Sequence, residues 1–80
     1  MIEEMTRGHI RLRVGDRTVT VGGEMLLSGH GSPNYVIYLN SIRAWDVPNA
    51  HIAIDEAGQL RIIDLLREEM RKRNMSIEIE

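Results

Sequence analysis

Tyr35-Val36-Ile37-Tyr38-Leu39 is the run of this 80-residue chain that is apolar on both faces of an extended strand. Aromatic and β-branched side chains favour the pleated surface of a sheet, and a run without polar alternation is typical of a strand covered on both sides. We therefore predict a central strand at residues 35–39. The next segment, residues 40–48, contains the single tryptophan, Trp45, and is interpreted as the exposed continuation of that strand.

Two alternating segments ahead of the central strand predict a β-hairpin. Residues 10–14 and 17–21 each place an apolar side chain at every second position, as half-buried strands do. Gly15-Asp16 lies between them, and a two-residue turn with glycine first suits a type II′ hairpin. This turn pairs Val14 with Arg17. All apolar residues of the hairpin then share one face, with Leu12 opposite Val19 and Ile10 opposite Val21.

Glycine and proline divide the remaining extended segments. Gly22-Gly23 is expected to break the strand, with a third strand following at residues 24–27 and a loop at residues 28–34. The first seven residues are interpreted as a short arm or an edge strand. Pro48 cannot donate a hydrogen bond to a neighbouring strand, so we expect an irregular crossing and then a short extended piece at residues 51–54.

The C-terminal part of the chain predicts one long helix, residues 56–73. Asp55 is a suitable N-cap, and Asn74 can end the helix in the left-handed conformation. The helix carries one apolar stripe at helical spacing, formed by Ile62, Ile63, Leu66 and Met70. Residues 75–80 alternate again and predict a last strand that returns to an edge of the sheet.

Together these elements predict a single α+β domain over residues 1–80. We expect an antiparallel sheet of about five strands, with the long C-terminal helix packed on one face and a short last strand. A domain of this size buries only about two-thirds of the surface that its unfolded chain exposes, which leaves little room for a deep active site.

Composition disfavours several classes of function. Twelve acidic and ten basic residues give a net charge of −2, which does not favour nucleic-acid binding. The chain has no cysteine, which excludes a disulfide framework and a thiolate nucleophile. The N-terminus lacks the basic start and apolar core of a secretory signal, and no apolar run reaches membrane-spanning length. We therefore expect a cytoplasmic protein that makes no contact with membranes.

Candidate chemistry is sparse in the sequence. The spacings of His9, His30 and His51 match no compact set of metal ligands, so we expect neither a metal nor a cofactor. None of the serines lies in a strand-turn-helix elbow with a recognisable base. We therefore do not expect an enzyme.

Trp45 and its neighbours are the candidates for partner binding. Tryptophan, tyrosine and arginine are the residue types that most often anchor protein interfaces, and Arg43 lies two positions from Trp45. A structural interpretation stands beside this one. The chain has no phenylalanine, so its core needs other large side chains, and Trp45 can close one end of the sheet.

Asn40-Ser41-Ile42-x-x-Trp45-x-x-Pro48, followed by the short acidic start of the final helix, is the most specific of several characteristic segments. Together these segments resemble the immunity protein 74 family of bacterial polymorphic toxin systems. The resemblance spans residues 5–70, whereas the loop at residues 28–31 and the tail after Asn74 do not share it. The other segments that carry it are Met5–Ile10, Val14–Val19, Gly23–Leu26 and Val36–Tyr38.

The resemblance implies a protein that binds a cognate toxin and neutralises it by occluding the toxin's active site or substrate path. This task needs surface complementarity and no catalysis. On this basis we expect the partner-binding residues to be Glu24, His30, Arg43, Trp45 and Asp46. The alternative, from a different class, is a self-associating structural or interaction module without a toxin partner. Such a module would form a homodimer through an exposed edge strand.

Overall fold

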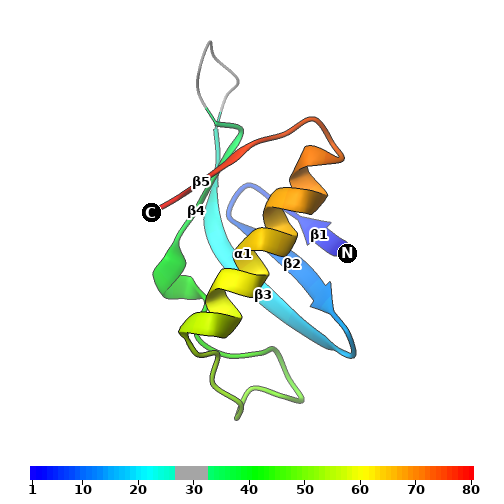
Figure 1. Cartoon of the computed structure of the whole chain (residues 1–80), viewed down its shortest axis with the longest axis vertical. Coiled ribbons are helices and arrows are strands. Elements are labelled where there is room, and N and C mark those ends of the chain that lie inside the picture. The colour runs from blue at the N-terminus through cyan, green and yellow to red at the C-terminus, as the bar shows by residue number, and fades with distance from the viewer. Residues whose placement is uncertain (27–32) are drawn as a thin grey trace.

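The structure is a computed structural model that describes residues 1–26 and 33–80. Within these residues, one α-helix packs on a five-stranded sheet (Figure 1). The strands lie side by side in sequence order: β1 (Ile2–Met5), β2 (His9–Val14), β3 (Arg17–Met25), β4 (Tyr35–Ile37) and β5 (Ile77–Ile79). A short 3-10 helix, η1 (Leu39–Ser41), and the long helix α1 (Glu56–Arg71) connect β4 to β5. The predicted α+β class is confirmed.

The β2–β3 hairpin has the predicted register. Val14 pairs with Arg17, Leu12 with Val19 and Ile10 with Val21. Gly15 has a φ of 65°, and Asp16 does not have a positive φ, as a type II′ turn requires. The N-terminal residues form an edge strand, β1, which pairs with β2 in antiparallel fashion.

The prediction that Gly22-Gly23 breaks the strand is wrong, because β3 runs through both glycines. Residues 17–22 of β3 pair with β2, and residues 23–25 pair with β4. A Cβ atom on Gly23 would overlap the carbonyl oxygen of Val36 and would lie 2.7 Å from Cε1 of Tyr35. Gly23 therefore allows β3 and β4 to approach each other closely. The residues next to Gly23 in the sequence do not indicate that a distant strand requires a glycine here.

Only the first part of the central run is buried, and its strand is shorter than expected. Tyr35 and Ile37 are fully buried, whereas Tyr38 and Leu39 are exposed. Tyr38 precedes η1, and Leu39 is the first residue of η1. The interpretation of residues 40–48 as a continuing strand is wrong. After η1 the chain crosses irregularly and forms a single bridge between Ala44 and Ala53. The hydroxyl of Tyr35 donates a hydrogen bond to the carbonyl of Thr6 at 2.9 Å.

Both ends of α1 follow the predicted signals. The Asp55 side chain accepts a hydrogen bond from the Gly58 amide at 2.8 Å, and Asn74 has a φ of 57°. The helix ends at Arg71, two residues before the predicted end. Its four stripe residues are buried in the core with the apolar side chains of the sheet.

The last strand returns to an edge of the sheet, as predicted, but it runs parallel to β4. The other pairs, β1–β2, β2–β3 and β3–β4, are antiparallel. The connection explains the difference, because a helical crossover such as α1 brings the chain back in its original direction. The sheet is therefore mixed, with one parallel pair.

Candidate partner-binding surface

The sheet face opposite α1 carries polar and charged side chains over β1, β2 and β3. Residues that pair directly across neighbouring strands share a face, so Arg11 lies beside Thr20 and Arg13 beside Thr18. The apolar positions between them point into the core. We call this surface the open face, and its members are Glu3, Glu4, His9, Arg11, Arg13, Thr18 and Thr20.

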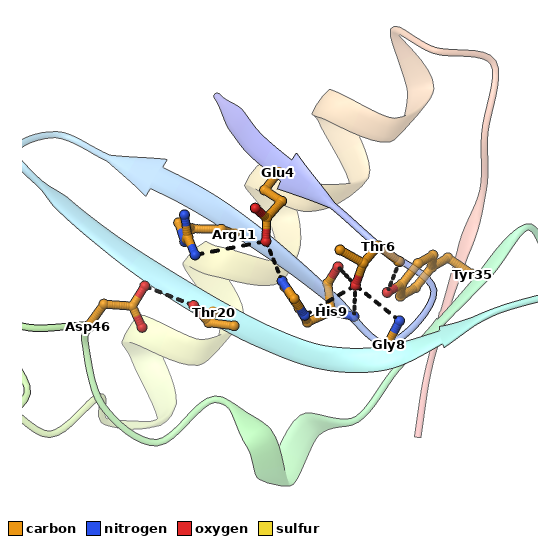
Figure 2. A network of polar contacts seen from close by, with 8 residues as sticks. All are labelled: Glu4, Thr6, Gly8, His9, Arg11, Thr20, Tyr35 and Asp46. Atoms are coloured by element: carbon orange, nitrogen blue, oxygen red, sulfur yellow. Dashed lines mark hydrogen bonds and ion pairs between the residues drawn. The ribbon is translucent and has the colours of Figure 1, made fainter.

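A bulge in β1 places both of its acidic residues on the open face. The register shifts between Ile2 and Glu4, so Glu3 is the extra residue. Glu3 accepts a hydrogen bond from Nε of Arg13 at 2.6 Å. Glu4 accepts one from Nε2 of His9, also at 2.6 Å, and lies 3.8 Å from a guanidinium nitrogen of Arg11 (Figure 2). The cations of β2 are therefore paired with the acids of β1.

The turn before β2 orients the His9 ring. Oγ1 of Thr6 accepts hydrogen bonds from the amides of Gly8 and His9 at 3.2 and 3.1 Å, the pattern of a Ser/Thr turn. The same oxygen lies 3.1 Å from Nδ1 of His9 (Figure 2). Both ring nitrogens of His9 thus have a polar partner, and its side chain is held in one orientation.

Glu4 gives this network a testable pH dependence. The hydrogen bond from His9, and then the charge of Arg11, lower the pKa of Glu4 below its usual value of 4.5. A lowered pKa stabilises the fold above the usual value, and this stabilisation is lost as the pH falls through the folded-state pKa. NMR titration of the Glu4 carboxyl carbon should show a higher pKa in the His9→Ala variant. The Arg13→Ala variant, which removes the partner of Glu3 instead, should leave the pKa of Glu4 unchanged.

Hydrogen bonds attach the segment Trp45-Asp46-Val47, which we call the Asp46 segment, to the open face. The Asp46 amide donates a hydrogen bond to the Thr18 carbonyl at 2.8 Å. Oδ2 of Asp46 accepts hydrogen bonds from the hydroxyls of Thr18 and Thr20 at 3.0 and 2.9 Å, and Figure 2 shows the second of these. The next residue, Val47, leaves 84% of its surface exposed. Asp46 therefore holds an apolar side chain at the border of a charged face.

Trp45 is partly buried. Its side chain packs against the core cluster, and the guanidinium of Arg17 lies 5.7 Å from the centre of its ring. This position fits the structural interpretation of Trp45 as a side chain that closes one end of the sheet. Its exposed part remains next to Asp46 and Val47.

The open face and the Asp46 segment enclose a shallow hollow of about 490 Å³. Cationic, anionic, hydroxyl and apolar groups all line it. It can therefore receive charged and apolar side chains of a partner through ion pairs, hydrogen bonds and contacts with Val47. Its lining residues are Glu3, Arg11, Arg13, Thr18, Thr20, Asp46 and Val47.

The structure brings only some of the predicted site residues together. Asp46 lines the hollow, and Trp45 precedes it in the chain. Arg43 is exposed nearby in sequence, with Nε donating to the Asn40 carbonyl at 2.7 Å. Glu24 lies at the other end of β3, where its carboxylate accepts a hydrogen bond from the Tyr38 hydroxyl at 3.3 Å. His30 lies outside the described residues.

Sequence reasoning missed most residues that line the hollow. The alternation of the hairpin places Arg11 and Arg13 on the face opposite its apolar residues, but nothing in the sequence joins them to Asp46. Glu3 lies on the open face only because of the bulge in β1, and no residue pattern near Glu3 in the sequence indicates a bulge. Val47 carries a weak signal, since it is an apolar residue beside a proline in a polar segment.

Two further findings concern other kinds of site. Among residues 1–26 and 33–80, no three histidine or acidic side chains come together in a way that could hold a metal ion. No helix in the described part of the chain has both the length and the apolar character needed to cross a membrane.

Comparison with known proteins gives one match. The family model described as Immunity protein 74 matches residues 2–80. This match is longer than the span of residues 5–70 on which the resemblance was based, and it includes the tail after Asn74. No curated protein and no solved structure matches the chain.

Proposed function

The chain belongs to the immunity protein 74 family, and we propose that it binds a cognate toxin and neutralises it by covering the toxin's active site or substrate path. Neutralisation would take place in the cytoplasm of the cell that makes both proteins. We propose this surface as the toxin-binding site because of the hollow between the open face and the Asp46 segment. Charged and apolar groups converge there on a rigid sheet.

The open face suits recognition because its side chains are held before a partner arrives. Arg13 is fixed by Glu3, and His9 is fixed by Thr6 and Glu4. A preorganised surface loses less side-chain entropy on binding than a mobile one does. Paired charges of both signs would mainly set the rate of association and the choice of partner.

The apolar border of the hollow would add to the affinity. Val47 is largely exposed, and burial of an exposed apolar side chain at the centre of an interface stabilises the complex. The partly buried Trp45 lies next to it in the chain. Of the five predicted partner-binding residues, we keep Trp45, Asp46 and Arg43 in the proposed site, while Glu24 and His30 stay as separate predictions.

The test begins with co-expression of the tagged protein and the product of the adjacent reading frame, followed by calorimetry on the purified pair. We expect a stoichiometric complex that abolishes the partner's toxicity. Arg13→Glu and Val47→Asp should each weaken the complex about tenfold or more. Arg61→Glu is the matched control, because Arg61 is exposed on α1, away from the hollow.

The possible outcomes test the proposed function and the proposed binding surface separately. If no complex forms and toxicity persists, the proposed function is wrong. If a tight complex forms and both hollow variants bind as well as Arg61→Glu does, the function stands and the proposed surface is wrong.

A further inference from the structure

The outer edge of β5 is unpaired in the described part of the chain. β5 is the last strand of the sheet and has β4 on one side only. The Glu80 amide donates to the Ile37 carbonyl at 2.8 Å, and the Glu80 carbonyl accepts from the Leu39 amide at 2.8 Å. Because alternate residues of a strand direct their backbone groups to opposite sides, those of Ile77 and Ile79 face away from β4. These groups form a template for another strand.

An apolar groove runs beside this edge, between β5 and α1. It has a volume of about 550 Å³, and Leu39, Leu60, Ile63 and Ile79 supply its apolar lining. Leu60 leaves 58% of its surface exposed and Leu39 leaves 38%, so the groove presents apolar surface to solvent. A strand added to β5 would place every second side chain in this groove.

The other face of the same edge is acidic. Glu24 pairs with Val36, and Val36 pairs with Glu78, so both carboxylates lie on one face on either side of Val36. Both side chains are exposed, as is Glu80. The carboxylates of Glu24 and Glu80 contribute to raising the pKa of the Tyr38 hydroxyl, with Glu24 the larger cause. Three carboxylates therefore lie at this corner of the sheet.

We propose that the outer edge of β5 binds an extended segment of a partner protein in which apolar residues alternate with lysine or arginine. The segment would add a sixth strand to the sheet. Its backbone would pair with Ile77 and Ile79, its apolar side chains would fill the groove beside α1, and its cations would lie next to Glu78 on the opposite face. This surface is separate from the hollow over β1–β3, so the proposal does not rest on the toxin.

Two of the registers in which a second copy of this chain could pair with the edge bring acidic side chains together. An antiparallel pair of β5 strands centred on Glu78 places the two Glu78 side chains directly opposite each other. A register centred on Ile79 places each Glu78 opposite Glu80 of the other copy. Like charges at directly opposite positions are destabilising. The predicted homodimer through an edge strand is therefore less suited to β5 than a basic strand is.

The other edge of the sheet is protected. β1 carries a bulge at Glu3, which is a device that discourages strand addition. β5 has neither a bulge nor a proline. The edge open to a partner strand is therefore β5.

The probe is a peptide of about ten residues that alternates valine with lysine, compared with a peptide that alternates valine with glutamate. Each is titrated into the full isotope-labelled chain and followed by NMR. We expect the lysine peptide to shift the amides of β5 and of the groove residues, and to slow hydrogen exchange at Ile77 and Ile79. The glutamate peptide should do neither at the same concentration.

Variants test the backbone and the charge separately. Ile79→Pro removes an amide that faces the free edge and not β4, so it should abolish peptide binding while the dispersed spectrum persists. Glu78→Lys should weaken binding of the lysine peptide about tenfold. Asp16→Lys makes the same change of charge in the distant β2–β3 turn and should leave binding unchanged.

Three results would overturn the proposal. The first is the absence of shifts in β5 with the lysine peptide. The second is equal binding of both peptides, which would show that Glu78 does not select a basic strand. The third is a dimer of the free protein, measured by sedimentation, whose Ile77 and Ile79 amides are already protected. That result would make a second copy the occupant of the edge.

Discussion

Gly23→Ala is expected to lower the free energy of unfolding by about 3 kcal/mol or more, at or beyond the upper end of typical overpacking effects. An added Cβ would overlap the backbone carbonyl of Val36 and crowd the buried ring of Tyr35, and a carbonyl in a sheet cannot rotate away as a flexible side chain can. The strands β3 and β4 would have to separate at this point. Urea unfolding followed by circular dichroism measures the effect.

Gly8→Ala is the matched control for this substitution. A Cβ on Gly8 would meet nothing within 4 Å, and its φ does not lie in the left-handed region. We expect its free energy of unfolding to stay within about 1 kcal/mol of that of the natural sequence, with stabilisation the more favoured direction. Equal stability of the Gly23 and Gly8 variants would show that β3 and β4 do not need their close approach.

The elements predicted correctly are those whose causes lie close together in the sequence. The β2–β3 register follows from one turn and from alternation on both sides of it, and the turn geometry requires no distant residue. The start of α1 follows from Asp55, whose side chain binds an amide three positions away. Local interactions of this kind leave their pattern in a short stretch of sequence.

The errors arise where a distant segment decides the structure. Gly23 looks like a strand breaker until Val36 is placed beside it. The direction of β5 depends on the path of the whole connection from β4, including α1, and its alternation is the same for a parallel or an antiparallel neighbour. The end of β4 at Ile37 depends on η1, which no apolar pattern marks.

The candidate site was predictable only in part for the same reason. Residue type points to Trp45, and the family resemblance adds Asp46. The structure shows that Asp46 reaches Thr18 and Thr20, more than 25 positions earlier in the chain. The hollow forms from β1, β2, β3 and the Asp46 segment, and the distances between these four segments cannot be read from the sequence. Glu24 was grouped with them although β3 places it near β4 and β5.

Asp46→Ala is expected to lower the free energy of unfolding by about 2 kcal/mol and to weaken toxin binding about tenfold or more. Its carboxylate accepts hydrogen bonds from two hydroxyls, and hydrogen bonds to a charged group stabilise a fold more than neutral ones do. Without them the segment that carries Trp45 and Val47 loses its side-chain attachment to β3 and keeps the backbone hydrogen bond to the Thr18 carbonyl. Urea unfolding and calorimetry with the toxin measure the two effects.

Asp46→Asn separates the two roles that Asp46 can have. An amide keeps one oxygen that can accept from Thr18 or Thr20, so most of the stability should remain. If Asp46 only positions Trp45 and Val47, the Asn variant keeps most of its toxin affinity while the Ala variant loses it. If the carboxylate itself contacts a cation of the toxin, both variants lose affinity to a similar extent and only the Ala variant loses stability. Full affinity of the Ala variant would contradict the placement of the Asp46 segment in the interface, since the segment would then be dispensable for binding.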